Sequence, residues 1–246
     1  MRVKHISIAV LLAFCSCNKP DAPDCLKTTG KEDVESRQPG KFSAVTISGD
    51  MDLVIVQGLD YKLELKAGAN LLKKIESSVN NGMLEIDNRN SCNFVRGYKK
   101  HIELRLTAPY LRHIISKSVG TISTEGSFNQ DSIELNLQSV GDIKLNGSFK
   151  EVVVNSGSHG DAYLYGNTER LYVYTSGANF VHAEELISKD YVLVNTNDLG
   201  DCMVNVDQTA LFEYKITNSG NIYYSGDAAL MTNLGDGQAK GRLIKK

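Results

Sequence analysis

A short segment built on Ser and Gly recurs along the second half of the chain. Two copies read SVGTISTEGSF from Ser118 and SVGDIKLNGSF from Ser139. The anchoring glycines, at spacings of 21, 19, 17, 23 and 20 residues, are Gly120, Gly141, Gly160, Gly177, Gly200 and Gly220. A repeat of this length is one supersecondary unit that cannot bury an apolar face alone, so neighbouring copies must stack. This period constrains the fold more than any other feature.

Polar and apolar residues alternate within each copy, as in Asp142-Ile143-Lys144-Leu145. An alternation with period two predicts a strand that buries one face. Further alternating runs lie between the glycines, at 133–137, 151–154, 171–173 and 191–194. Stacked at about 4.8 Å per rung, these units predict an all-β fold: a right-handed β-solenoid (β-helix) with rungs of about 20 residues and little helix. A sandwich of hairpins is the alternative that alternation alone does not exclude.

The predicted domain spans 41–246, with regular repeats over 116–240 and a less regular part over 41–115. In the less regular part we expect strands at 42–48, 51–57, 61–66, 83–87 and 101–106, and a helical turn at 70–75. Solenoids need capping elements at their ends. We therefore expect this part to cap the solenoid.

The N-terminus has the pattern of an export signal. Arg2 and Lys4 precede an apolar run of nine residues, 6–14, which suits a secretory signal and is too short to span a bilayer. A Cys directly after such a run resembles the cleavage box of bacterial lipoproteins, in which that Cys receives the lipid. Cys17, preceded by the small Ser16, is favoured, and Cys15 is the alternative. We expect a signal peptide at 1–16, a lipidated Cys with a flexible linker at 17–40, and an anchor in the outer membrane.

The three remaining cysteines are Cys25, Cys92 and Cys202. In an oxidising compartment one disulfide is possible and one thiol is left over. Cys202 stands where other repeats carry Ile or Leu, so we expect it to be buried, and Cys25 with Cys92 is the better pair. The sequence has no Cys/His cluster, so we expect no metal centre and no cofactor. A formal net charge of −2 without a basic stripe argues against a nucleic-acid partner.

One repeat position carries acidic or amide side chains and forms a candidate ligand column. Asp142, Asp161 and Asp201 share it, with Asn179 and Asn221 in the same column. Stacked carboxylates could hold Ca²⁺ or supply the acid and base of a polysaccharide lyase or hydrolase. Turn chemistry is the favoured alternative, because tight turns need Gly followed by Asp or Asn.

Tyrosines with an outward phase form a second candidate site, an aromatic binding face of Tyr163, Tyr172, Tyr174 and Tyr223. Exposed aromatic rings on a flat sheet can bind sugar rings or partner surfaces. Cross-strand stacking that stabilises the sheet is the commoner role of such residues.

An ordered set of motifs resembles one known family. The motifs are Cys25-Leu-Lys-Thr-Thr-Gly30, Phe42-x-x-Val-Thr-Ile47, Ala67-Gly-Ala-Asn-Leu-Leu72, Gly82-Met-Leu-Glu-Ile86, Cys92-Asn-Phe-Val-Arg-Gly-Tyr-Lys99 and Gly220-Asn-Ile-Tyr-Tyr-Ser-Gly226. Together with the repeats, they resemble the head GIN domain family of Bacteroidota lipoproteins, labelled "putative auto-transporter adhesin". The resemblance covers about residues 25–240. It implies an exported, lipid-anchored β-solenoid and brings no catalytic residues.

Three functions are compatible with these patterns. The leading hypothesis is a non-enzymatic, adhesin-like lipoprotein that acts as a binding or structural module of the cell envelope. The alternatives are a carbohydrate-active enzyme built on a β-helix and a periplasmic scaffold that binds another envelope protein. The expected partners are the membrane, through the lipid, and a glycan or an envelope protein. The sequence leaves open which side of the outer membrane the body faces.

Overall fold

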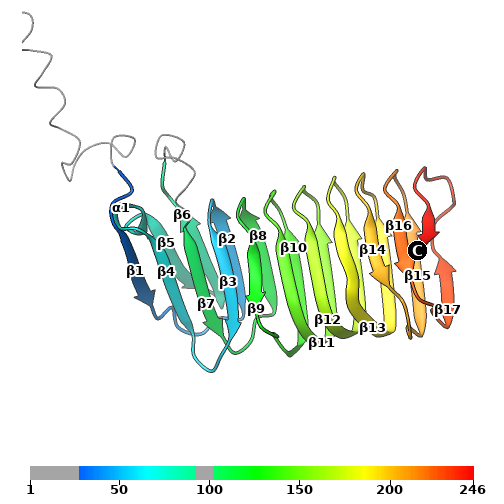
Figure 1. Ribbon diagram of the computed structural model, residues 1–246, viewed down its shortest axis with the longest axis horizontal. Coiled ribbons are helices and arrows are strands. Elements are labelled where there is room, and N and C mark those ends of the chain that lie inside the picture. The colour runs from blue at the N-terminus through cyan, green and yellow to red at the C-terminus, as the bar shows by residue number, and fades with distance from the viewer. Residues whose placement is uncertain (1–27, 92–101) are drawn as a thin grey trace, which may run out of the picture.

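The computed structural model describes residues 28–91 and 102–246, which form an elongated solenoid of β-strands (Figure 1). Among the described residues the only α-helix is a single turn, α1 (Ala69–Leu72). The predicted all-β solenoid is confirmed. The predicted signal peptide, the lipidation sites Cys17 and Cys15, and the pair Cys25 and Cys92 lie outside the described residues.

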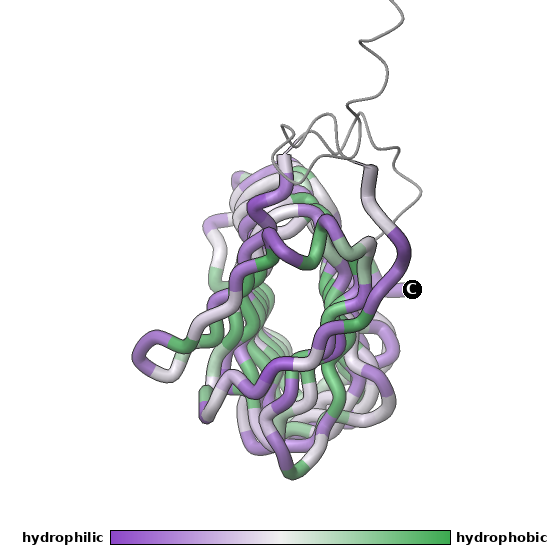
Figure 2. Tube along the Cα trace, turned by 90° about the vertical axis from the view of Figure 1, so that its left-hand side faces the viewer, coloured by the Kyte–Doolittle hydropathy of each residue, from purple (hydrophilic) through white to green (hydrophobic). Residues whose placement is uncertain are grey.

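The strands form one continuous hydrogen-bonded sheet that bends into two facing walls (Figure 2). Wall A is made, in spatial order, of β1 (Glu32–Arg37), β4 (Lys62–Gly68), β7 (Glu103–Ala108), β3 (Asp52–Gln57), β9 (Ile122–Glu125), the first halves of β11 (Ile143–Ser156), β12 (Ala162–Thr175) and β13 (Val181–Thr196), then β14 (Cys202–Asn205), β16 (Ile222–Ser225) and β18 (Leu243–Lys245). Wall B is made of β5 (Ile75–Asn80), β6 (Met83–Asn88), β2 (Ala44–Gly49), β8 (His113–Ser118), β10 (Gln130–Leu137), the second halves of β11, β12 and β13, then β15 (Leu211–Ile216) and β17 (Leu230–Asn233).

Neighbouring rungs pair in parallel, so residues at the same repeat position stack in columns that run along the solenoid. The inward column Ile133, Val152, Leu171, Val192 and Phe212 is at most 1% exposed throughout. The period-two alternation produces this core, because every second side chain points between the walls.

Cys202 is fully buried, in register with Val181 and Ile222, as the repeat predicted. Burial raises the pKa of its thiol to about 12.

Turn glycines allow successive rungs to approach each other closely. A Cβ on Gly141 would lie 2.1 Å from the Gly120 carbonyl oxygen, and one on Gly220 would lie 2.0 Å from that of Gly200. A side chain at these positions would therefore overlap the backbone of the preceding rung.

The expected repeat phase is wrong at one rung. Gly177 does not belong to the glycine column; Asn179 takes the place between Gly160 and Gly200, because a Cβ on Gly200 would meet the Asn179 carbonyl oxygen at 2.0 Å. The pairings of Val181 with Ala162 and Cys202 fix this phase. Phe180, and not Asn179, therefore follows the turn at the position of the Asp column.

The N-terminal end is built differently from the repeats. Strands β2 and β3 form one rung. On one side of it lies the rung of β6 and β7, and on the other side the rung of β8 and β9, so the spatial order of the rungs departs from their order in the chain. Antiparallel strands β1, β4 and β5 and the buried Leu71 and Leu72 of α1 cover the end of the core. Strand β1 lies in the segment that we expected to be a linker, and strand β5 was not expected. The sequence of β1 is polar, Glu-Asp-Val-Glu-Ser-Arg. It shows no apolar alternation because the strand is an exposed edge.

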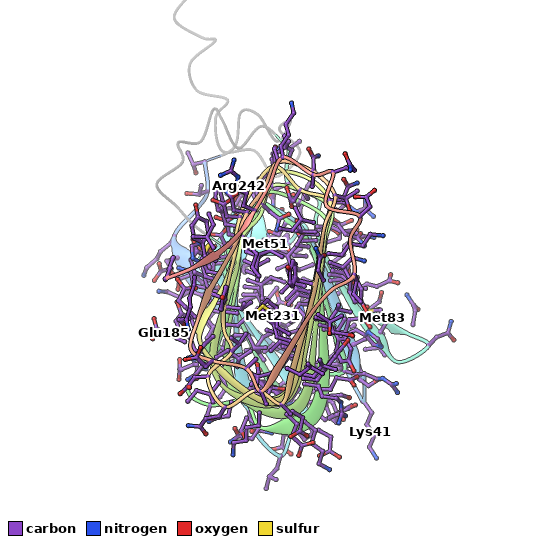
Figure 3. The ribbon with its side chains drawn as sticks, turned by 90° about the vertical axis from the view of Figure 1, so that its right-hand side faces the viewer. Lys41, Met51, Met83, Glu185, Met231 and Arg242 are labelled. Carbon is purple, nitrogen blue, oxygen red and sulfur yellow. The ribbon has the colours of Figure 1, made fainter. Side chains whose placement is uncertain are left out.

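The opposite end of the solenoid is the C-terminal one (Figure 1). Figure 3 looks onto it: Met231 of β17 lies at the near end of the core and Met51 deeper inside. Met231 is 37% exposed and Met51 is 1% exposed. In the described part of the chain, no helix is long and apolar enough to cross a membrane.

Candidate functional site

The predicted Asp column is a ladder of hydrogen bonds between rungs. The Oδ1 atom of Asp142 accepts a bond from the N–H of Asp161 at 3.0 Å, and the Oδ1 atom of Asp161 accepts one from the N–H of Phe180 at 2.7 Å. Asp201 accepts from the N–H of Asn221 at 2.7 Å in the same way. Each carboxylate thus satisfies a backbone donor in the next turn.

This ladder leaves the metal and acid–base hypotheses without geometric support. Phe180 interrupts the column between Asp161 and Asp201. Within residues 28–91 and 102–246, no group of three or more His, Cys, Asp or Glu side chains could hold a metal ion. Turn chemistry accounts for the acidic residues of this column.

The four predicted tyrosines do not share one face. Tyr163 and Tyr223 lie on wall A, whereas Tyr172 and Tyr174 lie on wall B. The alternation along a strand distinguishes side chains that point inward from those that point outward. It does not predict the bend of β12 between Thr168 and Arg170, which places the two halves of this strand on different walls. The single aromatic face predicted from the sequence is therefore wrong.

On wall A, the faces of Tyr163 are covered by its neighbours in the column. Its ring is stacked on that of His182, with centroids 4.5 Å apart and planes 1° from parallel. The Lys144 ammonium, one rung away on the other side, lies 5.5 Å from the Tyr163 centroid. The Lys246 ammonium, two residues beyond the register partner Ile244, lies 5.1 Å from the ring centroid of Tyr223. These contacts are the cross-strand stacking expected of a structural role.

On wall B, Tyr172 is engaged and Tyr174 is free of ring contacts. The Tyr172 ring packs against Tyr191 at 5.3 Å, and the Tyr191 hydroxyl donates a hydrogen bond to Glu213 at 2.5 Å. Burial, and then this bond, raise the pKa of Tyr191 above its ordinary value. Tyr174 makes no ring contact with the described residues and is 38% exposed. Of the four tyrosines, Tyr174 is exposed and the other three are half-buried.

Tyr174 stands in a shallow groove on wall B with a volume of about 580 Å³, which we call the amide groove. It crosses four rungs, where β10, β11, β12 and β13 run into their turns. Its outward column is Asn136, Asn155, Tyr174 and Asn195. Its turn column is Gln138, Gly157, Ser176 and Asn197. No residue that lines the groove is charged.

Small residues in the turn column make the groove hollow, because Gly157 and Ser176 stand between the larger Gln138 and Asn197. A Cβ on Gly157 would lie 3.6 Å from the Ser176 Oγ atom and 3.7 Å from its carbonyl oxygen, which is ordinary contact. The backbone there does not adopt a positive φ. Unlike Gly141, Gly157 is therefore not required by the fold, and its effect is to leave space.

The groove holds hydrogen-bonding groups without an intramolecular partner. The side-chain amides of Gln138, Asn195 and Asn197 make no hydrogen bond within the described parts of the chain. The Ser156 hydroxyl also has no partner there, but its side chain stands in the inward column between Leu137 and Thr175 and points into the core. Gln138 and Asn197 are exposed and Asn195 is half-buried, so these amides can exchange hydrogen bonds with water for hydrogen bonds with a ligand.

Sequence reasoning missed the groove, although one signal was present. Asn136, Asn155 and Asn195 precede the same turn in three rungs and have the outward phase. Tyr174 alone belonged to a predicted site. Depth could not be inferred, because it depends on the side-chain volumes of two adjacent columns.

Comparison with known proteins agrees with this architecture. The family model described as "putative auto-transporter adhesin, head GIN domain" matches residues 41–228. A comparison with proteins of curated function found no match.

Solved structures share the fold at low sequence identity. A putative adhesin of Bacteroides fragilis has a TM-score of 0.79 and 19% identity, over 88% of this chain and 97% of that one. A protein of Parabacteroides distasonis titled a putative lipid binding protein has a TM-score of 0.63 and 15% identity, over 88% and 97%. A putative adhesin of Parabacteroides merdae has a TM-score of 0.58 and 15% identity, over 89% and 98%. The family match, the ordered motifs and the stacked rungs together show that this chain belongs to the head GIN domain family.

Proposed function

We propose that this chain is a non-catalytic, adhesin-like binding module of the cell envelope and that the amide groove is its ligand site. The groove itself carries the proposal: the free amides of Gln138, Asn195 and Asn197 and one exposed Tyr ring can bind a ligand. Its lining contains no carboxylate, imidazole, amine or thiol that could act as a general acid, general base or thiolate nucleophile. Membership of a family of adhesins supports a place in the envelope or at the cell surface.

We further propose that a lipid on Cys17 holds the chain in the outer membrane. The described chain begins at one end of the elongated solenoid (Figure 1). An anchor before that end leaves both walls, and with them the amide groove, open to solvent. Several acyl chains together give stable membrane attachment, because each buried methylene contributes about 0.8 kcal/mol.

The anchor is tested by metabolic labelling with a fatty acid in the wild type and in Cys17→Ser, with Cys15→Ser as the matched control. We expect Cys17→Ser alone to abolish labelling and to release the protein from the membrane fraction. Labelling that survives in Cys17→Ser and is lost in Cys15→Ser would move the anchor to the other cysteine. Unlabelled wild type would refute a lipid anchor.

The exposure of the body is tested by protease treatment of intact cells, with a known periplasmic protein as the control. Digestion of the solenoid while the control survives supports an adhesin-like role at the surface. Protection until the outer membrane is permeabilised would contradict the adhesin role. The periplasmic scaffold would then be the function to pursue, by capture of an envelope partner.

A further inference from the structure

We propose that the amide groove binds a neutral, linear glycan that lies along the solenoid axis with about one sugar per rung. This inference rests on the proposed role as a binding module and names the ligand class of its site. It follows from three properties of the groove: its lack of charge, its periodicity and its one open aromatic ring.

The first property, the absence of charge, selects a neutral ligand. Phosphate and carboxylate ligands are usually recognised by Arg or Lys, and no residue of the groove lining is charged. The nearby Glu134 accepts hydrogen bonds from the amides of Asn136 and Asn155, at 3.0 and 2.9 Å. Side-chain amides offer both donors and acceptors, which matches a ligand whose hydroxyls do the same.

The second property, periodicity, selects a linear polymer. Asn136, Asn155, Tyr174 and Asn195 are direct partners in successive parallel rungs. Their spacing of about 4.8 Å along the axis is close to the length of one sugar ring in an extended chain. A glycan laid along the groove therefore meets an equivalent polar position at each sugar.

The third property, the open ring of Tyr174, suits a sugar better than another polar polymer. A ring edge or face that is not covered by its neighbours can pack against the C–H face of a sugar. Gly157, in the turn column of the neighbouring rung, leaves room beside it.

An extended peptide fits the groove less well. Strands β10 and β13 are each hydrogen-bonded to neighbours on both sides, and so are β11 and β12 between them. No free strand edge is present in the groove, so a peptide could not add as a further strand, which is the usual source of affinity in that mode.

The test measures binding of neutral oligosaccharides to the purified full chain by calorimetry, in a detergent without a sugar headgroup. Gluco-, manno- and xylo-oligosaccharides of one to six units are the probes, and an oligogalacturonate is the charged control. We expect at least one neutral series to bind, with affinity that rises with length until about four units, the number of rungs crossed. The charged series is expected to bind more weakly.

Variants locate the binding. Gly157→Leu fills the groove, and Tyr174→Ala removes its open ring; each is expected to weaken binding by about tenfold or more. Tyr172→Ala, two residues away on the same wall, and Asn167→Ala, near the middle of β12 and outside the groove lining, are matched controls expected to change affinity less than about twofold. Circular dichroism verifies that each variant keeps its β-structure.

Two outcomes would overturn this inference. Either no neutral series binds, or binding survives both Gly157→Leu and Tyr174→Ala in folded protein. A different result would refute the proposed function: cells that express the chain would attach to host or bacterial surfaces no more than cells without it. Attachment that persists in Gly157→Leu would retain the adhesin and refute the groove.

Discussion

The same substitution, Gly to Ala, should have opposite effects at two turn glycines, Gly157 and Gly141. At Gly157 the added methyl makes ordinary contacts at 3.6 Å and beyond, and the backbone does not adopt a positive φ. Replacing Gly where the native backbone allows Ala stabilises a protein by roughly 0.4–1 kcal/mol, because the unfolded chain loses freedom. For a chain of this size the midpoint temperature should rise by about 1–4 °C.

At Gly141 the added methyl would lie 2.1 Å from the Gly120 carbonyl oxygen, while real contacts of this kind stay above 3.0 Å. The rungs would have to separate by nearly 1 Å, by the difference of these two distances. The hydrogen bond from the Gly141 N–H to the Ser118 carbonyl, now 3.1 Å, would be lost. Overpacking of about 1–3 kcal/mol and a lost bond of about 1 kcal/mol give a cost of roughly 2–4 kcal/mol.

Thermal and urea unfolding of the full chain, followed by circular dichroism, measure both effects. Gly141→Ala should lower the midpoint by about 5–15 °C. Equal destabilisation by the two substitutions would show that Gly157 is also structural, and the argument that it keeps the groove open would fail. A neutral Gly141→Ala would refute the close packing of the turns.

Three further predictions concern side chains outside the groove. Asp161→Asn keeps an oxygen acceptor for the Phe180 N–H and should leave stability nearly unchanged. Asp161→Ala should lower the free energy of unfolding in urea by about 0.5–1.5 kcal/mol. A midpoint of urea unfolding that Ca²⁺ raises in the wild type and not in Asp161→Asn would instead indicate a metal site. The pKa of Tyr191 is raised in the folded state, so its contribution to stability is present below the unfolded pKa near 10 and lost as the pH rises through the folded pKa. Tyr191→Phe should flatten this alkaline loss in unfolding experiments at increasing pH, and an unchanged profile would exclude Tyr191 as its source. Cys202, with its pKa raised to about 12, should resist alkylation near pH 8 until the chain unfolds, as peptide mass mapping would show, and rapid labelling in the folded chain would contradict its burial.

The fold was largely predictable because its cause is local and repeated. Alternation predicted the inward column that includes Leu171 and Val192, and the repeat predicted the burial of Cys202. The phase failed at Gly177, because a second glycine near the true turn position, Asn179, imitates the anchor. Similarity of sequence between rungs therefore does not establish which residue of one rung stacks on which residue of the next.

Long-range features were harder to predict from the sequence. The place of β2 and β3 between later rungs depends on pairing between distant strands, which no local pattern encodes. The edge strand β1 contributes hydrogen bonds but no buried side chain, so it carries no apolar signal. The separation of Tyr163 from Tyr172 depends on where β12 bends.

The central claim, that the amide groove is the ligand site of a binding module, is tested most directly by nuclear magnetic resonance of the isotopically labelled chain. The side-chain amide signals of Gln138, Asn195 and Asn197 would be followed as a neutral tetrasaccharide that binds is added. The account predicts shifts that saturate and that cluster on these amides and on Tyr174, while Asn167 stays unchanged. Saturating shifts that cluster on wall A or at an end of the solenoid, with the groove amides unmoved, would contradict it.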